Sequence, residues 1–261
     1  MEISIGILAW KSGPTLQKTL ETYQKNGLLH LSDDVTIYFQ EISEADKKLA
    51  EKYHVRYIGG AENVGIGKGF ISLAEHAKYD NILLLEHDWN LIENPSVTKK
   101  RLLSGIDLLN NGFHVVKYRH RNRPGVPLYS ETFKGRELDY FDEWHQCTSP
   151  HLLESVHWLD PAEQFPDKIQ KEGEYFITTS RWGNWSNNPS LFKKDFYIEV
   201  VKPLAGDRVD LERKMALFWP KQNFKVAHGE GLFTHKDFIK FPPKTFLGKA
   251  KTMLKKILKK K

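Results

Sequence analysis

Two carboxylates, Glu86 and Asp88, directly follow a run of four branched aliphatic residues at 82–85. Such a run is typical of a strand that is buried on both faces. Because successive side chains of a strand alternate, Glu86 and Asp88 are predicted to point to the same side where the strand leaves the sheet. Two carboxylates in that position suit a hard divalent cation such as Mg²⁺ or Mn²⁺. The alternative is an ordinary polar turn after a strand.

A glycine-rich segment precedes this run. Asn63 is followed by Gly65, Gly67 and Gly69, with Lys68 among them, at the start of a predicted helix. The free backbone N–H groups and the dipole at a helix start favour an anion such as a phosphate. A dinucleotide fingerprint is expected after the first strand, whereas this run follows the third, which argues against NAD binding. A tight strand-to-helix connection is the alternative.

Two tryptophans and three asparagines lie within residues 181–188. Trp182 and Trp185 offer flat faces on which a sugar ring can stack, and Asn187 and Asn188 offer amide groups to its hydroxyls. This composition predicts a sugar-binding segment, which we assign to the acceptor. A surface loop whose tryptophans are anchored in the core is the alternative.

The pattern of elements predicts the scaffold that positions these residues. Strands alternate with helices in the first part of the chain, which predicts an α/β fold, a three-layer sandwich with a mostly parallel mixed central sheet. Ligands of such folds bind beyond the carboxyl ends of the strands, where Glu86 and Asp88 lie. The predicted strands are 3–8, 35–39, 55–58, 82–85, 113–118, 175–179 and 224–227. The predicted helices are 12–26, 44–53, a stretch through 70–77, 96–110 and 208–218, and residues 119–173 and 229–235 are predicted as loops.

This order of elements resembles the nucleotide-diphospho-sugar glycosyltransferases of the GT-A fold, particularly family 2. The resemblance is carried by 3–10 as first strand and nucleotide loop, by 63–65, and by 81–88 as the strand with the acidic end. It implies that Mn²⁺ or Mg²⁺ is held against the diphosphate of a nucleoside-diphosphate sugar, the donor substrate. Asp88 is then the direct ligand, and Glu86 occupies the first position of a D-x-D-like motif.

The resemblance also assigns contacts to the donor nucleotide. Ala9 and Trp10 end the first strand and Glu41 follows the second, at positions that contact the base and the ribose in these enzymes. The donor-binding set is completed by Asn63, Gly65, Lys68, Glu86 and His87. His87 is expected to point to the opposite side of its strand from Glu86.

Members of the family usually take the catalytic base from an acidic pair at the start of a late helix. In this chain Asp207 and Asp210 share one helical face there, and either can take the proton from the acceptor hydroxyl in an inverting transfer. Asp210 is preferred, because Asp207 has the position of an N-cap. His235 is placed to complete the metal shell, as a C-terminal histidine does in some GT-A enzymes. A structural histidine is the alternative.

The basic residues are concentrated at the C-terminal end. We expect a catalytic domain at 1–240, with a nucleotide-sugar-binding half at 1–112 and an acceptor-binding half at 113–240, and a tail at 241–261. Residues 244–261 hold eight lysines and no acid, and the rest of the chain carries 31 basic and 33 acidic groups. The net charge of +6 therefore does not indicate nucleic-acid binding. Apolar residues recur every three or four positions in the tail, which predicts binding to an anionic membrane surface, or packing on the body.

The sequence thus favours a metal-dependent glycosyltransferase in cell-surface polysaccharide or glycoconjugate synthesis, with a glycan or lipid-linked acceptor. One cysteine, Cys147, and the lack of a recognisable signal peptide predict a cytoplasmic protein, peripheral on the inner face of a membrane. A sugar nucleotidyltransferase is one alternative, but residues 9–13 do not supply the glycine-rich loop expected after its first strand. A non-enzymatic, peripheral membrane-binding module is the other.

Overall fold

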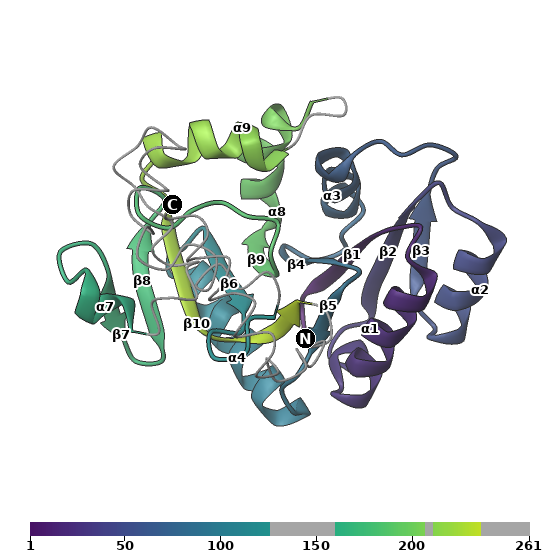
Figure 1. Ribbon diagram of the computed structural model, residues 1–261, viewed down its shortest axis with the longest axis horizontal. Coiled ribbons are helices and arrows are strands. Elements are labelled where there is room, and N and C mark those ends of the chain that lie inside the picture. Colours follow the sequence, from purple (N-terminus) through teal and green to yellow (C-terminus); the bar gives the residue numbers. More distant parts are fainter. Residues whose placement is uncertain (126–159, 207–210, 236–261) are drawn as a thin grey trace, which may run out of the picture.

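One mixed sheet crosses the whole molecule (Figure 1). The computed structural model describes residues 1–125, 160–206 and 211–235. The strand order is β3-β2-β1-β4-β9-β6-β10-β8-β7, and β5 pairs with β10. Helices cover both faces of this sheet, so the predicted α/β fold class, a three-layer sandwich, is confirmed. The predicted base candidates Asp207 and Asp210 and the tail 241–261 lie outside the described residues.

The N-terminal half is the regular alternation that the sequence predicts. Its four parallel strands match the predicted strands to within one or two residues. The elements are β1 (Ser4–Trp10), α1 (Gly13–Lys25), β2 (Asp34–Gln40), α2 (Glu44–Lys52), β3 (Arg56–Gly59), α3 (Ile66–Glu75) and β4 (Asn81–Glu86), with a short helical turn at Leu28–His30.

Local signals explain where these helices begin and end. Ser43 and Asp46 form a reciprocal capping box at the start of α2. Gly27, with φ of 78°, follows the end of α1 in the left-handed region that glycine adopts without strain. Asn94 caps α4 (Pro95–Asn110) by accepting from the N–H of Val97.

The C-terminal half is mixed rather than parallel. The strand β9 (Ser190–Lys193) lies antiparallel between β4 and β6 (Val115–Arg119), and β10 (Lys225–His235) runs parallel to β6. The remaining elements are β5 (Trp89–Leu91), α7 (Pro161–Gln164), β7 (Gln170–Glu172), β8 (Tyr175–Thr179), α8 (Lys194–Phe196) with turns at Tyr197–Val201 and Lys202–Leu204, and α9 (Leu211–Phe218) with a turn at Trp219–Lys221. The sequence patterns did not predict β5, β7 and β9, and the prediction of a loop at 119–173 is wrong where α7 and β7 lie.

The prediction of a loop at 229–235 is wrong, because these residues continue β10. The pairing of β10 with β6 is irregular between His228 and Phe233, and Gly231 has a φ of 88° there. The glycines that indicated a loop instead let the strand pass this irregularity and remain in the sheet.

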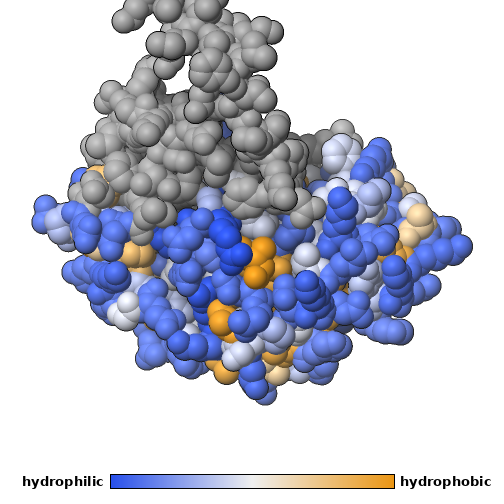
Figure 2. All heavy atoms as spheres, turned by 60° about the horizontal axis from the view of Figure 1, so that its bottom comes forward, coloured by the Kyte–Doolittle hydropathy of each residue, from blue (hydrophilic) through white to orange (hydrophobic). Residues whose placement is uncertain are grey.

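The sheet separates two hydrophobic layers. Leu83 and Leu85 of β4 pack toward α1, α2 and α4, whereas Ile82 and Leu84 pack toward α3 and α9. The apolar run at 82–85 is therefore buried on both faces, as predicted. The face toward the viewer in Figure 2 is mainly hydrophilic, with small separate hydrophobic areas. In the described ranges, no helix has both the length and the apolar character needed to cross a membrane.

Candidate metal and nucleotide site at the sheet edge

Asp88 and His235 meet where β5 and β10 pair. The chain turns at His87 and Asp88 after β4 and returns as β5, and in the antiparallel pairing Trp89 lies opposite His235. Asp88 Oδ2 lies 3.1 Å from His235 Nε2, and these side chains are 13% and 20% exposed. The fold thus joins a carboxylate and an imidazole that are 147 residues apart in sequence.

The turn at His87 and Asp88 changes the geometry that strand alternation predicts. Because β4 ends at Glu86, the period-two rule does not extend to Asp88. Glu86 is half-buried and lies beside Leu8 of β1 in the sheet register. Glu86, Asp88 and His235 do not form a three-residue group of converging ligand atoms in the described part of the chain. The structure brings two of the three predicted ligands together.

The carboxyl ends of β1 and β2 bring Trp10 and Glu41 together. The Trp10 Nε1–H group donates to Glu41 Oε1 at 3.1 Å, and Lys11 Nζ lies 2.6 Å from Glu41 Oε2. Both bonds lower the pKa of the Glu41 carboxyl, and the bond with Lys11 has the larger effect. Trp10 is 47% exposed although Ala9 beside it is buried, so its ring is available for stacking. Lys11 and Glu41 have positive φ, of 45° and 54°, a strained conformation that is common at functional sites.

The glycine-rich segment lies next to this pair. The Gly65 N–H donates to both Gln40 Oε1 at 2.9 Å and Asn63 Oδ1 at 2.8 Å, which fixes the entry to α3 beside the end of β2. Lys68 is exposed on the first turn of α3. A Cβ on Gly69 would lie 2.5 Å from Leu8 Cδ1, so this glycine allows α3 to approach β1 closely.

The predicted sugar-binding segment has a core part and a polar part. Trp185 is 7% exposed and packs on Trp219 with ring centroids 5.1 Å apart. The centroid of the Trp182 ring lies 4.6 Å from Lys168 Nζ. The Asn187 N–H donates to Glu212 Oε1 of α9 at 2.7 Å, and Asn188 is half-buried.

Four consecutive residues of this segment hold buried polar atoms that have no hydrogen-bond partner among the described residues. These atoms are Asn184 Oδ1, Trp185 Nε1, Ser186 Oγ and Asn187 Oδ1. A buried polar group that is left unsatisfied costs about 1–3 kcal/mol, so four in a row are unusual in a folded protein. Their chemistry fits a ligand that both donates and accepts hydrogen bonds.

Buried cations on β6 were not singled out from the sequence. Lys117 and Arg119 alternate along β6, so they face the same side of the sheet, and they are 2% and 4% exposed. Lys117 Nζ donates to Asn184 O at 2.7 Å, and the Arg119 guanidinium lies 5.5 Å from the Trp89 ring. The sequence signal is the basic alternation within an otherwise apolar strand.

A second group of possible ligand atoms was also missed. Glu93, His120 and Glu230 each offer one ligand atom, and these atoms lie within 4.8 Å of one another. His120 Nδ1 accepts the N–H groups of Asn122 and Arg123, so Nε2 carries the proton that is donated to Glu93 Oε1 at 2.9 Å. In this tautomer neither ring nitrogen is available to a metal. The three residues come from distant segments, so no spacing motif could have found them.

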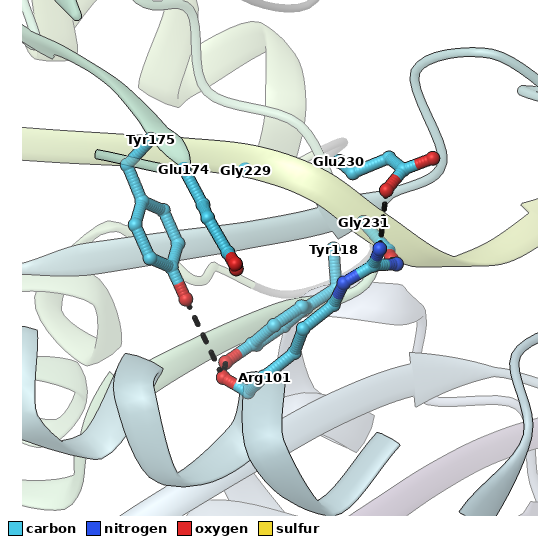
Figure 3. Close-up of a pocket in the computed structure, with 7 residues that line it drawn as sticks. All are labelled: Arg101, Tyr118, Glu174, Tyr175, Gly229, Glu230 and Gly231. Carbon is cyan, nitrogen blue, oxygen red and sulfur yellow. Dashed lines mark hydrogen bonds and ion pairs between the residues drawn. The ribbon is translucent and has the colours of Figure 1, made fainter. Parts of the chain in front are cut away.

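Two arginines complete this second group. Arg101 pairs with Glu230 and lies 3.5 Å from Glu93 Oε1, and Arg123 Nη2 lies 3.2 Å from the same oxygen. Figure 3 shows Arg101 reaching Glu230, with the Tyr175 hydroxyl directed at the Arg101 main-chain carbonyl. A cation would have to displace these guanidinium groups, so we interpret the group as an ionic network that ties α4, β10 and the segment after β6 together.

Solved structures share this fold at low sequence identity. Residues 1–349 of S. aureus TarS match with a TM-score of 0.58 and 12% identity, over 90% of this chain and 60% of that chain. A longer S. aureus TarS structure matches with a TM-score of 0.53 and 14% identity, over 90% and 37%. Glucosyl-3-phosphoglycerate synthase of Mycobacterium tuberculosis, in complex with Mn²⁺, UDP and phosphoglyceric acid, matches with a TM-score of 0.50 and 13% identity, over 90% and 70%.

These likenesses establish the GT-A type of fold. This chain spans about three fifths of the length of TarS 1–349. No protein-family model matches the chain, and no curated protein sequence matches it.

Proposed function

We propose that this protein is a metal-dependent glycosyltransferase that moves a sugar from a nucleoside-diphosphate sugar to a glycan or lipid-linked acceptor. The observation that carries the proposal is the contact between Asp88 and His235 at the carboxyl edge of a GT-A sheet. In the sheet register Glu86 lies beside Leu8, so the turn with Asp88 and the end of β1 with Trp10 leave the sheet side by side. Open α/β sheets bind their ligands at this edge.

The metal-ligand atoms at this edge fit Mn²⁺. A carboxylate and a neutral imidazole are both good ligands for Mn²⁺, whereas Mg²⁺ prefers oxygen ligands throughout. Asp88 and His235 would hold the ion, with Glu86 at the end of β4 as a further candidate. The ion would supply a Lewis acid to the charge that develops on the departing diphosphate. The GT-A structure from M. tuberculosis supports this choice, because it holds Mn²⁺ with UDP.

The side chains around this point take separate roles. The exposed Trp10 ring stacks on the base and Glu41 accepts from the ribose, with Ala9, Asn63, Gly65, Lys68 and His87 around the donor. The buried charges of Lys117 and Arg119 add a positive field on one side of the sheet.

The acceptor is bound by the segment 182–188 in this proposal. Its unsatisfied atoms, Trp185 Nε1 and Asn187 Oδ1 among them, supply a donor and an acceptor for sugar hydroxyls, and Trp182 and Asn188 flank them. Asp210, or Asp207, takes the proton of the acceptor hydroxyl in an inverting transfer.

Nucleotide titration tests the proposal and separates the two clusters. We expect UDP or GDP to bind the wild type more tightly with Mn²⁺ than without it in isothermal titration. Asp88→Asn and His235→Gln should abolish the Mn²⁺ dependence, whereas the matched Glu93→Gln should keep it. If no nucleoside diphosphate binds, the proposal is wrong. If Glu93→Gln alone removes the Mn²⁺ dependence, the ion is held by Glu93, His120 and Glu230.

The basic tail supports a membrane partner in this proposal. Residues 244–261 combine eight lysines with apolar residues at helical spacing, a pattern that favours anionic membrane surfaces and hence lipid-linked acceptors. We expect the full chain to sediment with anionic vesicles and a chain truncated after Phe241 to remain in solution. Equal sedimentation of both would contradict this role of the tail.

A further inference from the structure

One face of α1 carries polar residues where a core-facing helix would carry apolar ones. Thr19, Thr22 and Tyr23 of α1 and the C-cap residue Asn26 are spaced three or four residues apart, so they lie on one side of the helix. Thr19 and Tyr23 are fully buried. Buried polar side chains are retained where they make specific hydrogen bonds.

All four side chains bond to the main chain of one segment, 87–91. Thr19 Oγ1 donates to His87 O and the Tyr23 hydroxyl donates to Trp89 O, both at 2.7 Å. Thr22 Oγ1 accepts the Leu91 N–H at 3.0 Å, and Asn26 Nδ2 donates to Leu91 O at 2.8 Å. This segment contains the turn after β4 and all of β5.

The first two bonds enclose Asp88. The carbonyls that Thr19 and Tyr23 bind belong to the residues immediately before and after Asp88. His87 O is part of the peptide group that leads into Asp88, and Trp89 O is part of the peptide group that follows Trp89, so the two bonds hold the chain on both sides of Asp88. Burial and the nearby Asp88 carboxylate raise the pKa of Tyr23 well above its usual value, so its hydroxyl remains protonated and acts as a donor.

We propose that Thr19 and Tyr23 are positioning residues of the metal site, which hold the turn in the conformation that presents Asp88 to His235. The inference rests on the proposed function, because it assumes that this pair holds the cation. A turn that is already ordered pays no ordering cost when the ion binds, so the two hydroxyls raise metal affinity without touching the metal.

The chain offers matched variants for the test. Thr19→Val and Tyr23→Phe each remove one hydroxyl and nearly keep the shape of the side chain. Thr19→Ser keeps the hydroxyl and removes the methyl group. Ser32→Ala is the control, because the buried Ser32 hydroxyl also donates to a main-chain carbonyl, that of Ile3, at a site distant in sequence from the turn. We would measure Mn²⁺ affinity in the presence of UDP by electron paramagnetic resonance, together with the melting temperature of each variant.

We expect Thr19→Val and Tyr23→Phe to weaken Mn²⁺ binding about tenfold, with UDP affinity in the absence of metal unchanged. Thr19→Ser should bind Mn²⁺ nearly as the wild type does, and Ser32→Ala should lower only the melting temperature. If the α1 variants lower the melting temperature as Ser32→Ala does and leave Mn²⁺ affinity unchanged, the inference is wrong and the proposed function stands. If the wild type does not bind Mn²⁺, or if Asp88→Asn binds it equally well, the proposed function fails and the inference fails with it.

Discussion

Replacing Gly231 by alanine should destabilise the protein through the irregular part of β10. Gly231 has a φ of 88°, and a Cβ there would lie 2.6 Å from Arg119 C and 2.7 Å from His120 Cα. These atoms are backbone, so no side-chain rotation can relieve the contact. The strand must move away from β6, which weakens the bonds from His120 N to Phe233 O at 2.7 Å and from Arg121 N to Glu230 O at 2.8 Å.

The expected loss in the free energy of unfolding of Gly231→Ala is the sum of two contributions. An alanine in the left-handed region costs about 1–2 kcal/mol, and two weakened backbone hydrogen bonds cost about 1–3 kcal/mol together. The total of about 2–5 kcal/mol is a large part of the 5–15 kcal/mol that stabilises a typical domain. Because His235 follows four residues later on the same strand, we expect Mn²⁺ affinity to fall as well.

Urea unfolding of Gly231→Ala and Gly173→Ala measures this effect. Gly173 also has a positive φ, of 57°, but a Cβ there meets nothing within 4 Å, so Gly173→Ala should cost only the conformational term of about 1–2 kcal/mol. The difference between the two free energies of unfolding isolates the close approach of β10 to β6. Equal losses in the two variants would refute the reasoning.

Two further outcomes follow from the candidate site and its network. Trp10→Ala should weaken nucleoside-diphosphate binding by about 1–3 kcal/mol, the usual worth of a base stacked on an aromatic ring. Trp10 is 47% exposed, so the melting temperature should change little. Equal nucleotide affinities of the variant and the wild type in a titration would contradict the stacking role. Burial lowers the pKa of His120 below its ordinary value, against the opposing effect of Glu93. The unfolded chain therefore binds the proton more readily than the folded protein, so stability is complete above about pH 6.5 and is lost as the pH falls from there toward the lowered pKa. As the pH is lowered from 7.5 to 5, the urea midpoint should fall more steeply for the wild type than for His120→Gln. Equal slopes for the two proteins would contradict the lowered pKa of His120.

The parts of the fold that were predictable are those with a repeating physical signal. The apolar run at 82–85 and the helix stop at Gly27 each determine a local structure from adjacent residues, and both are confirmed. The short strand β9 lies antiparallel between two parallel neighbours, an arrangement set by pairing partners far away in sequence. A four-residue strand has no periodicity from which that arrangement could be read.

Single residues of the candidate site could be predicted from the sequence, but the contacts between them could not. Asp88 and His235 were proposed as ligands for separate reasons, and the structure adds that they are in contact. Strand alternation grouped Asp88 with Glu86, but the turn that begins at His87 changes the direction of the chain. The α1 hydroxyls, such as that of Thr19, were not recognised, because a threonine in a helix gives no sequence signal of what it binds.

The strand pair of β5 and β10 places two different carboxylate–histidine contacts near its two ends. At one end Asp88 lies 3.1 Å from His235, and at the other Glu93 lies 2.9 Å from His120. For the second contact, the structure fixes the tautomer of the histidine. His120 Nδ1 accepts two backbone N–H groups, so its other nitrogen is committed as a donor to Glu93. His235 Nε2 faces the Asp88 carboxylate, and an imidazole nitrogen and a carboxylate oxygen are both ligands that suit Mn²⁺. A contact between a carboxylate and a histidine is therefore a structural anchor at His120, where two backbone N–H groups fix the tautomer, and the candidate metal site at Asp88 and His235.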